Sequence, residues 1–180
     1  MHVLVNFAAF QVGWFSSVLG AAAQMPWLGP VVLLVAVALH LRQARRPDLE
    51  IGLILACGII GLCFDSVLVA LGWVAYPSGQ LNASLAPYWI VTMWMLFATT
   101  LNISMRWLRG RLPLAAALGA VAGPLSYLAG QRLGGMEFIE SGNALVFLAV
   151  GWAAVMPLIV TLAERLDGFE VATARTGERP

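Results

Sequence analysis

Six stretches of apolar residues follow one another along the chain, and turn-forming or charged residues separate them. Their approximate limits are 3–23, 27–41, 51–75, 88–108, 114–133 and 143–163. A transmembrane helix needs about 20 mainly apolar residues, which all but the short second stretch supply. The pattern predicts an all-α polytopic membrane protein, a bundle of six transmembrane helices that forms one domain over residues 1–165.

The composition favours lipid as the solvent of this bundle. Hydrophobic residues make up 61% of the chain and charged residues only 11%, whereas soluble domains carry roughly 25% charged residues. So few charges cannot cover a water-facing surface. The net charge of +1 gives no indication of a nucleic-acid partner. All basic residues are arginine, which is typical of a GC-rich bacterial genome.

Arginine is distributed unequally between the connections. Nine of the ten arginines fall in the second and fourth connections or after the sixth stretch, and only Arg132 lies toward the other side. The positive-inside rule therefore predicts a multi-pass protein of the bacterial inner membrane with both termini in the cytoplasm. We expect the first stretch to be a retained helix, because no Arg or Lys precedes it as in a signal peptide. We expect residues 166–180 to form a disordered cytoplasmic tail.

Small residues at helical spacing mark the faces through which membrane helices approach one another. The third and fifth stretches carry such faces. Their glycines are predicted to pack against neighbouring helices: Gly58, Gly61, Gly72, Gly119, Gly123 and Gly130.

Asp65 is the only acid that this pattern places within the hydrocarbon region. An aspartate in mid-membrane costs about 2.5–3.5 kcal/mol on insertion scales, so it needs hydrogen-bond partners at similar depth. Two interpretations stay open, a proton or ligand site and a structural interhelical hydrogen bond. The candidate members of this polar site are Gln11, Thr99, Asn102, Ser126 and Tyr127.

A second polar group is expected nearer the cytoplasm. Asn6, His40 and Arg106 lie at comparable depth and predict a pocket that opens toward the cytoplasm. In an alternative role, the Arg106 side chain extends to lipid phosphates. No grouping of Cys, His and Asp has the spacing of a zinc or di-iron site, so neither a metal nor another cofactor is predicted.

Three runs of sequence carry a resemblance: NFAAFQVGWF at 6–15, WMLFATTLN at 94–102 and GPLSYLAG at 123–130. In them the chain resembles a family of small bacterial inner-membrane proteins catalogued only as a domain of unknown function. The resemblance implies a gene context near cyclopropane-fatty-acid synthase-like enzymes, but no activity or cofactor. It also implies a histidine after Asn102, where this chain has Ile103, so no metal or catalytic role is inferred there.

Three functions stay open at this point. The first is an accessory protein that presents membrane lipid to cytoplasmic enzymes of fatty-acyl modification. The second is a small proton-coupled transporter centred on Asp65, and the third is an intramembrane enzyme that uses Asp65 with Asn102 or His40. The sequence favours the first over an enzyme. It does not determine the substrate or the oligomeric state.

Overall fold

The computed structural model describes residues 3–169, and helices dominate them. Two pairs of residues form short strands, and a 3₁₀ turn, η1, follows the fourth helix. The predicted all-α fold is therefore confirmed for the described part of the chain. The elements are α1 (Val3–Ala22), α2 (Leu28–Leu41), α3 (Pro47–Ala70), β1 (Val74–Ala75), α4 (Tyr88–Leu101), η1 (Arg106–Leu108), α5 (Leu112–Arg132), β2 (Glu137–Phe138) and α6 (Ser141–Arg165).

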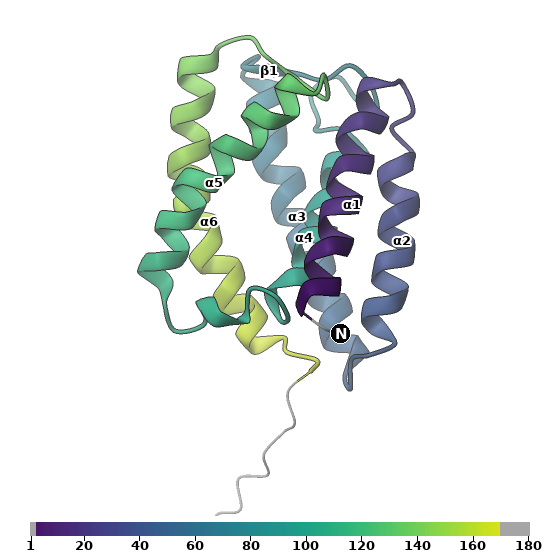
Figure 1. Cartoon of the computed structure of the whole chain (residues 1–180). Helices are drawn as coiled ribbons and strands as arrows, with labels where there is room; N and C mark the ends of the chain where they lie inside the picture. The colour runs from purple at the N-terminus through teal and green to yellow at the C-terminus, as the bar shows by residue number, and fades with distance from the viewer. Residues whose placement is uncertain (1–2, 170–180) are drawn as a thin grey trace, which may run out of the picture.

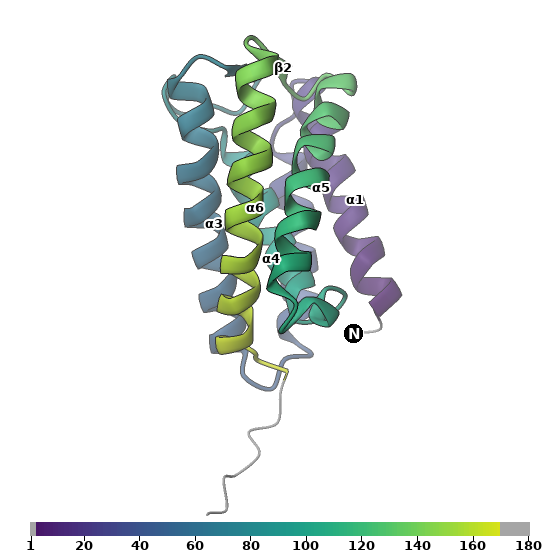
Figure 2. The ribbon, with the colours of Figure 1, turned by 90° about the vertical axis from the view of Figure 1, so that its left-hand side faces the viewer.

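The helices run side by side and alternate in direction (Figures 1 and 2). Sequence neighbours form hairpins, α1 with α2, α3 with α4, and α5 with α6. Helix α4 is the most central, because it also packs against α1, α2 and α6. At the end far from the start of α1, β1 and β2 pair antiparallel and tie two interhelical connections together.

Four helices, α1, α3, α5 and α6, are long and apolar enough to cross a membrane by length and composition. This is the property expected of a membrane protein. Helices α2 and α4 have 14 residues each and are therefore about 21 Å long. That is less than the hydrocarbon core of about 30 Å, so length alone assigns four spans rather than the predicted six.

Helix α4 ends at Leu101, whereas the sequence predicted that it continues to residue 108. The amide N–H groups of Ile103 and Met105 both donate to the carbonyl oxygen of Thr100, at 3.1 and 2.9 Å. These bonds form a tight turn and interrupt the i→i−4 hydrogen-bond pattern of the α-helix. Hydrophobicity did not reveal the break, because the apolar run continues through it.

Gly72 was predicted to pack against another helix, and this prediction is wrong. Its φ is +68°, and a Cβ built on it would meet nothing within 4 Å. Its amide donates to the carbonyl of Val69, and that of Trp73 donates to the carbonyl of Leu68. This pattern terminates helices at a left-handed glycine. Gly72 therefore ends α3, which is why the helix is shorter than the apolar stretch to residue 75.

Four of the five other predicted glycines lie at helix contacts. A Cβ on Gly61 would lie 2.1 Å from the Trp94 ring, and one on Gly58 would lie 3.0 Å from Met95. On α5, a Cβ on Gly119 would lie 2.3 Å from the Trp152 carbonyl oxygen, and one on Gly123 would lie 2.4 Å from the Trp152 ring. A Cβ on Gly130 would lie at an ordinary 3.7 Å from Met136, in the connection after α5. Two indole rings thus fill the space that missing side chains leave on α3 and α5.

We predict that Gly61→Ala destabilises the bundle by about 1–3 kcal/mol, the usual cost of overpacking a core. The added methyl group collides with a ring rather than with the end of a flexible side chain. Thermal unfolding in detergent, followed by size-exclusion chromatography, measures the effect. Gly52→Ala on the same helix is the control, since its Cβ would meet Leu166 at 3.9 Å. Equal unfolding temperatures for the two variants would contradict the predicted contact.

Candidate functional site

Asp65 is fully buried and accepts three hydrogen bonds. The Tyr127 hydroxyl donates to Oδ1 at 2.6 Å and the Tyr76 hydroxyl donates to the same oxygen at 3.3 Å. The Trp94 Nε1–H donates to Oδ2 at 2.7 Å. These four residues, the Asp65 cluster, join α3, α4, α5 and the connection after β1. The three hydrogen bonds agree with the structural interpretation of Asp65, in which its carboxyl group connects neighbouring helices.

Of the partners predicted for Asp65, the structure brings only Tyr127 to it. The Thr99 hydroxyl donates to the Leu96 carbonyl and that of Ser126 to the Gly123 carbonyl. Sequence reasoning missed Tyr76 and Trp94, since aromatic residues of a membrane helix are usually assigned to the interface or to lipid contact. The available signal was that both residues carry a hydrogen-bond donor, an O–H or an N–H, which a buried acid needs.

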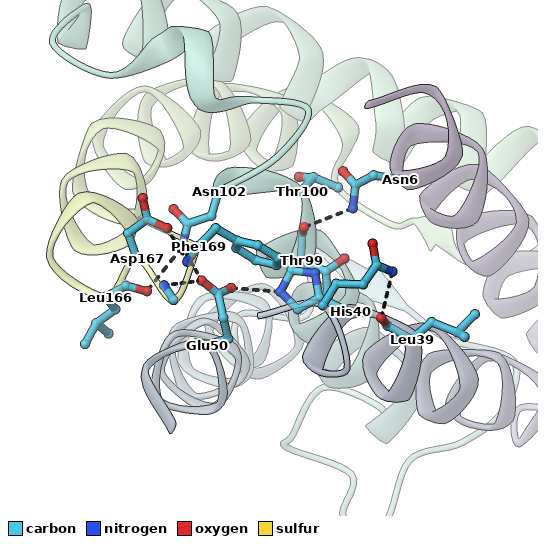
Figure 3. Close-up of polar contacts among 12 residues, drawn as sticks. Asn6, Leu39, His40, Glu50, Thr99, Thr100, Asn102, Leu166, Asp167 and Phe169 are labelled. Atoms are coloured by element: carbon cyan, nitrogen blue, oxygen red, sulfur yellow. Dashed lines mark hydrogen bonds and ion pairs between the residues drawn. The ribbon is translucent and has the colours of Figure 1, made fainter. Parts of the chain in front are cut away.

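Glu50, in the first turn of α3 and outside the predicted polar sites, forms a second buried centre (Figure 3). Glu50 Oε1 accepts from Asn102 Nδ2 at 2.8 Å and from the Gly168 amide at 2.7 Å. Glu50 Oε2 lies 2.8 Å from His40 Nε2, and both side chains are 0% exposed. Glu50, His40, Asn102 and Gly168 are the Glu50 cluster.

The hydrogen bonds of His40 point to one tautomer. Nε2 faces the Glu50 carboxylate, whereas Nδ1 is buried and has no hydrogen-bond partner among residues 3–169. An orphaned buried N–H costs more than an unused lone pair, so the proton belongs on Nε2. The Phe169 ring covers the imidazole edge-on at a centroid distance of 5.1 Å. Both side chains of the His40–Glu50 pair are thus removed from solvent.

Ion pairs surround this cluster. Asp167 binds Arg106 and Arg109, with 2.8 Å to Arg109 Nη1, and Arg109 Nη2 donates to Asn102 Oδ1 at 2.6 Å. Arg106 was predicted to line a pocket or to reach lipid phosphates. It instead forms an ion pair with Asp167, a partner that the sequence placed in a disordered tail.

The segment Leu166 to Phe169 is ordered, which corrects the predicted disorder from residue 166 onward. The Gly168 carbonyl accepts from the amides of Arg45 and Arg46 at 2.8 and 3.0 Å. A Cβ on Gly168 would lie 2.4 Å from the Arg46 carbonyl oxygen, so only glycine fits there. The rest of the predicted tail, 170–180, lies outside the described residues.

The predicted cytoplasmic-side group does not form one pocket. Asn6 donates to the Thr99 carbonyl at 3.0 Å and accepts from the Ser104 hydroxyl at 2.7 Å. These bonds fix the start of α1 against the end of α4. His40 belongs to the Glu50 cluster instead, and Arg106 to the ion pairs around it. Within residues 3–169 no three His, Cys, Asp or Glu side chains gather as metal ligands.

The two buried acids stand far apart on one helix. Asp65 follows Glu50 by 15 residues in α3, which corresponds to about 22 Å along the axis. Asn102 and His40 both bind Glu50. The geometry therefore does not support an active site that combines Asp65 with Asn102 or His40, since catalytic groups must reach one substrate.

A pocket of about 500 Å³ lies between α1, α4, α5 and α6. We call it the central pocket. No charged side chain lines it, and four tryptophans do. Its lining residues are Phe10, Gln11, Trp14, Phe15, Met93, Trp94, Phe97, Met105, Trp107, Leu118, Gly119, Ala122, Gly123, Ser126, Tyr127, Trp152 and Met156.

The central pocket separates α1 from α5. Helix α1 packs against α2 and α4, and α5 packs against α6. Trp107 on η1 forms the rim at the end where α1 begins, and it is 51% exposed. Trp94 and Tyr127 belong both to the wall and to the Asp65 cluster. Trp152 stacks on Trp94 at 4.5 Å and shapes the side toward α6.

These features define a helical bundle of membrane-length apolar helices with an aromatic pocket and two buried polar clusters. The chain belongs to the family described as "Protein of unknown function (DUF2878)", whose family model matches residues 3–158. This confirms the predicted resemblance to a family without an assigned activity. No curated protein and no solved structure matches the chain.

The ion pairs of Asp167 predict a pH dependence of stability. Burial raises the pKa of this carboxyl, but hydrogen bonds from the Phe169 amide and Arg109 and the charges of Arg109 and Arg106 outweigh it. The net pKa lies below the ordinary value of 3.8. Because the pKa is lower in the folded than in the unfolded state, the charged carboxylate stabilises the fold at pH values above the ordinary pKa of 3.8. This stabilisation is lost as the pH falls through the lower pKa of the folded state.

Asp167→Asn is therefore expected to lower the unfolding temperature near pH 7 and to flatten its decline toward about pH 3. Asp48→Asn is the matched control. Asp48 also pairs with an arginine, Arg46, but both side chains are 61% exposed, and exposed pairs contribute little. Parallel pH profiles for wild type and Asp167→Asn would refute the role of Asp167.

Proposed function

We propose that this protein is an integral membrane protein that binds one acyl chain of a membrane lipid in the central pocket. The pocket itself carries the proposal. Its volume of about 500 Å³ lies within the range of about 300–1,000 Å³ that is typical of ligand sites. An uncharged aromatic wall requires an occupant that is largely apolar.

The surroundings favour a lipid chain over other apolar molecules. Residues of α1 and α5 line opposite sides of the pocket, and many of their outward side chains, such as Leu4 and Val121, are exposed and apolar. In a membrane such faces contact lipid. Acyl chains are the most abundant apolar groups in a membrane. We propose that they enter the central pocket from the side between α1 and α5.

The rim suggests how the lipid is oriented. Trp107 is amphipathic and half-exposed, a property of residues that lie at the headgroup level. Arg111 is exposed shortly after it in the chain, and arginine suits lipid phosphate. We place the headgroup beside Trp107 and the chain along the wall toward Tyr127.

We further propose six crossings in a bacterial inner membrane, with both termini in the cytoplasm. The alternating direction of all six helices supports six crossings (Figures 1 and 2). The turn after α4 and η1 extend that segment beyond its 14 helical residues. The arginine distribution supports the orientation. A lipid headgroup at the arginine-rich end would then face the cytoplasm.

This orientation gives the protein a role as an accessory factor that presents lipid to cytoplasmic enzymes of fatty-acyl modification. The headgroup end stays accessible to a soluble enzyme, while the pocket holds the chain. The protein supplies binding and position in this scheme and no catalytic group.

Filling part of the central pocket should weaken lipid binding. Ala122 on α5 lines the pocket and has room toward it. In Ala122→Phe the ring would displace at least two methylene groups of the chain, each worth about 0.8 kcal/mol of burial. We expect about tenfold weaker retention of phospholipid, measured by native mass spectrometry of the purified protein.

Ala117→Phe is the matched control. Ala117 is an exposed alanine of the same helix that does not line the pocket. It should retain lipid as wild type does. Equal losses in both variants, or in neither, would contradict binding in the pocket.

The proposed orientation predicts the behaviour of C-terminal reporter fusions. Alkaline phosphatase, which is active only outside the cytoplasm, should be inactive when fused after residue 180, whereas a fluorescent protein should fluoresce. A phosphatase fusion within 78–86, between α3 and α4, is the positive control. An active phosphatase at the C-terminus would overturn the topology.

A further inference from the structure

Gln11 is a polar side chain without a partner in the wall of the central pocket. Building on the proposed function, we infer that the bound acyl chain carries an uncharged hydroxyl group far from its headgroup, and that Gln11 recognises this hydroxyl. This assigns a ligand class, the hydroxylated acyl chain, and a residue that determines specificity.

The surroundings of Gln11 make an unused amide costly. Gln11 lies in α1 among apolar residues, and it makes no hydrogen bond to any residue between 3 and 169. Its side chain offers two N–H donors and a carbonyl acceptor. Hydrocarbon supplies no hydrogen-bond partner for the donors or for the acceptor. Gln11 also borders a groove on the outer side of α1, together with Phe15, so it stands between that groove and the pocket.

Two hydroxyl groups also lie in this wall. The Ser126 hydroxyl donates to the Gly123 carbonyl at 2.7 Å, and the Tyr127 hydroxyl donates to Asp65 at 2.6 Å. Both hydroxyl donors are thus used within the protein, and each oxygen keeps a lone pair for another partner. The Trp152 Nε1–H of the same wall is buried and has no hydrogen-bond partner among residues 3–169.

A ligand group that satisfies both the N–H donors and the carbonyl acceptor of Gln11 must be neutral and must both accept and donate. It accepts from the Gln11 amide and donates to Gln11, Ser126 or Tyr127. A hydroxyl does both. An ester carbonyl only accepts, and no charged side chain in the wall would balance an ionised group.

The position of Gln11 along α1 indicates where on the acyl chain this hydroxyl lies. Gln11 follows Val3, the first residue of α1, by eight positions, or about 12 Å along the helix axis. The connection between α4 and α5, which contains Trp107, lies at the same end of the bundle as the start of α1 (Figure 1). A lipid with its headgroup at Trp107 therefore reaches Gln11 with the middle of its chain.

The test offers the purified protein an equal mixture of two phosphatidylcholines, one with stearoyl and one with 12-hydroxystearoyl chains. Native mass spectrometry measures the ratio of the bound lipids. One net hydrogen bond corresponds to about fivefold preference, so wild type should retain the hydroxylated lipid in about fivefold excess. Gln11→Leu should bring the ratio close to one, and Gln11→Met should do the same.

Gln43→Leu is the control. Gln43 is exposed and donates to the Leu39 carbonyl outside the pocket, so this variant should keep the wild-type preference. Equal binding of the two lipids by wild type overturns the inference and leaves the proposed function standing. A preference that survives in both Gln11 variants also overturns it. Failure to bind either lipid contradicts the proposed function itself.

Discussion

Two carboxyl groups buried on one helix organise this bundle. In a bilayer, polar groups must find partners within the protein, and neither Glu50 nor Asp65 is paired within α3. Asp65 draws donors from α4, α5 and the connection after β1. Glu50 draws them from α2, from the end of α4 and from the segment after α6. Because lipid gives no hydrophobic force between helices, these bonds and the close glycine contacts fix how the helices are arranged.

The same bonds shape the central pocket. Tyr127 and Trp94 present their rings to it while their polar atoms point at Asp65. Asp65 thus positions two parts of the wall. Two polar groups of the wall have no hydrogen-bond partner within the described residues, the Gln11 amide and the Trp152 Nε1–H.

The candidate site was only partly predictable. Asp65 stood out because a charge within an apolar stretch is rare, and Tyr127 followed from matching depth. Glu50 was missed because it directly follows Arg46–Leu49, which reads as a connection. Its burial depends on Asn102 and on Gly168, which lie 52 and 118 residues away in sequence. Pairings over such separations leave no periodic signal, and so Asn102 was assigned to the wrong acid.

The sequence by itself determined the all-α class, the apolar helices and most of their limits, because hydrophobic length and periodicity are local properties. It also marked the glycines at which helices approach, apart from Gly72, whose positive φ depends on how α3 ends. Only the tertiary structure decided which polar atoms meet, where the chain after α6 lies, and that a pocket separates α1 from α5. These features depend on the relative placement of helices, which several distant contacts set together.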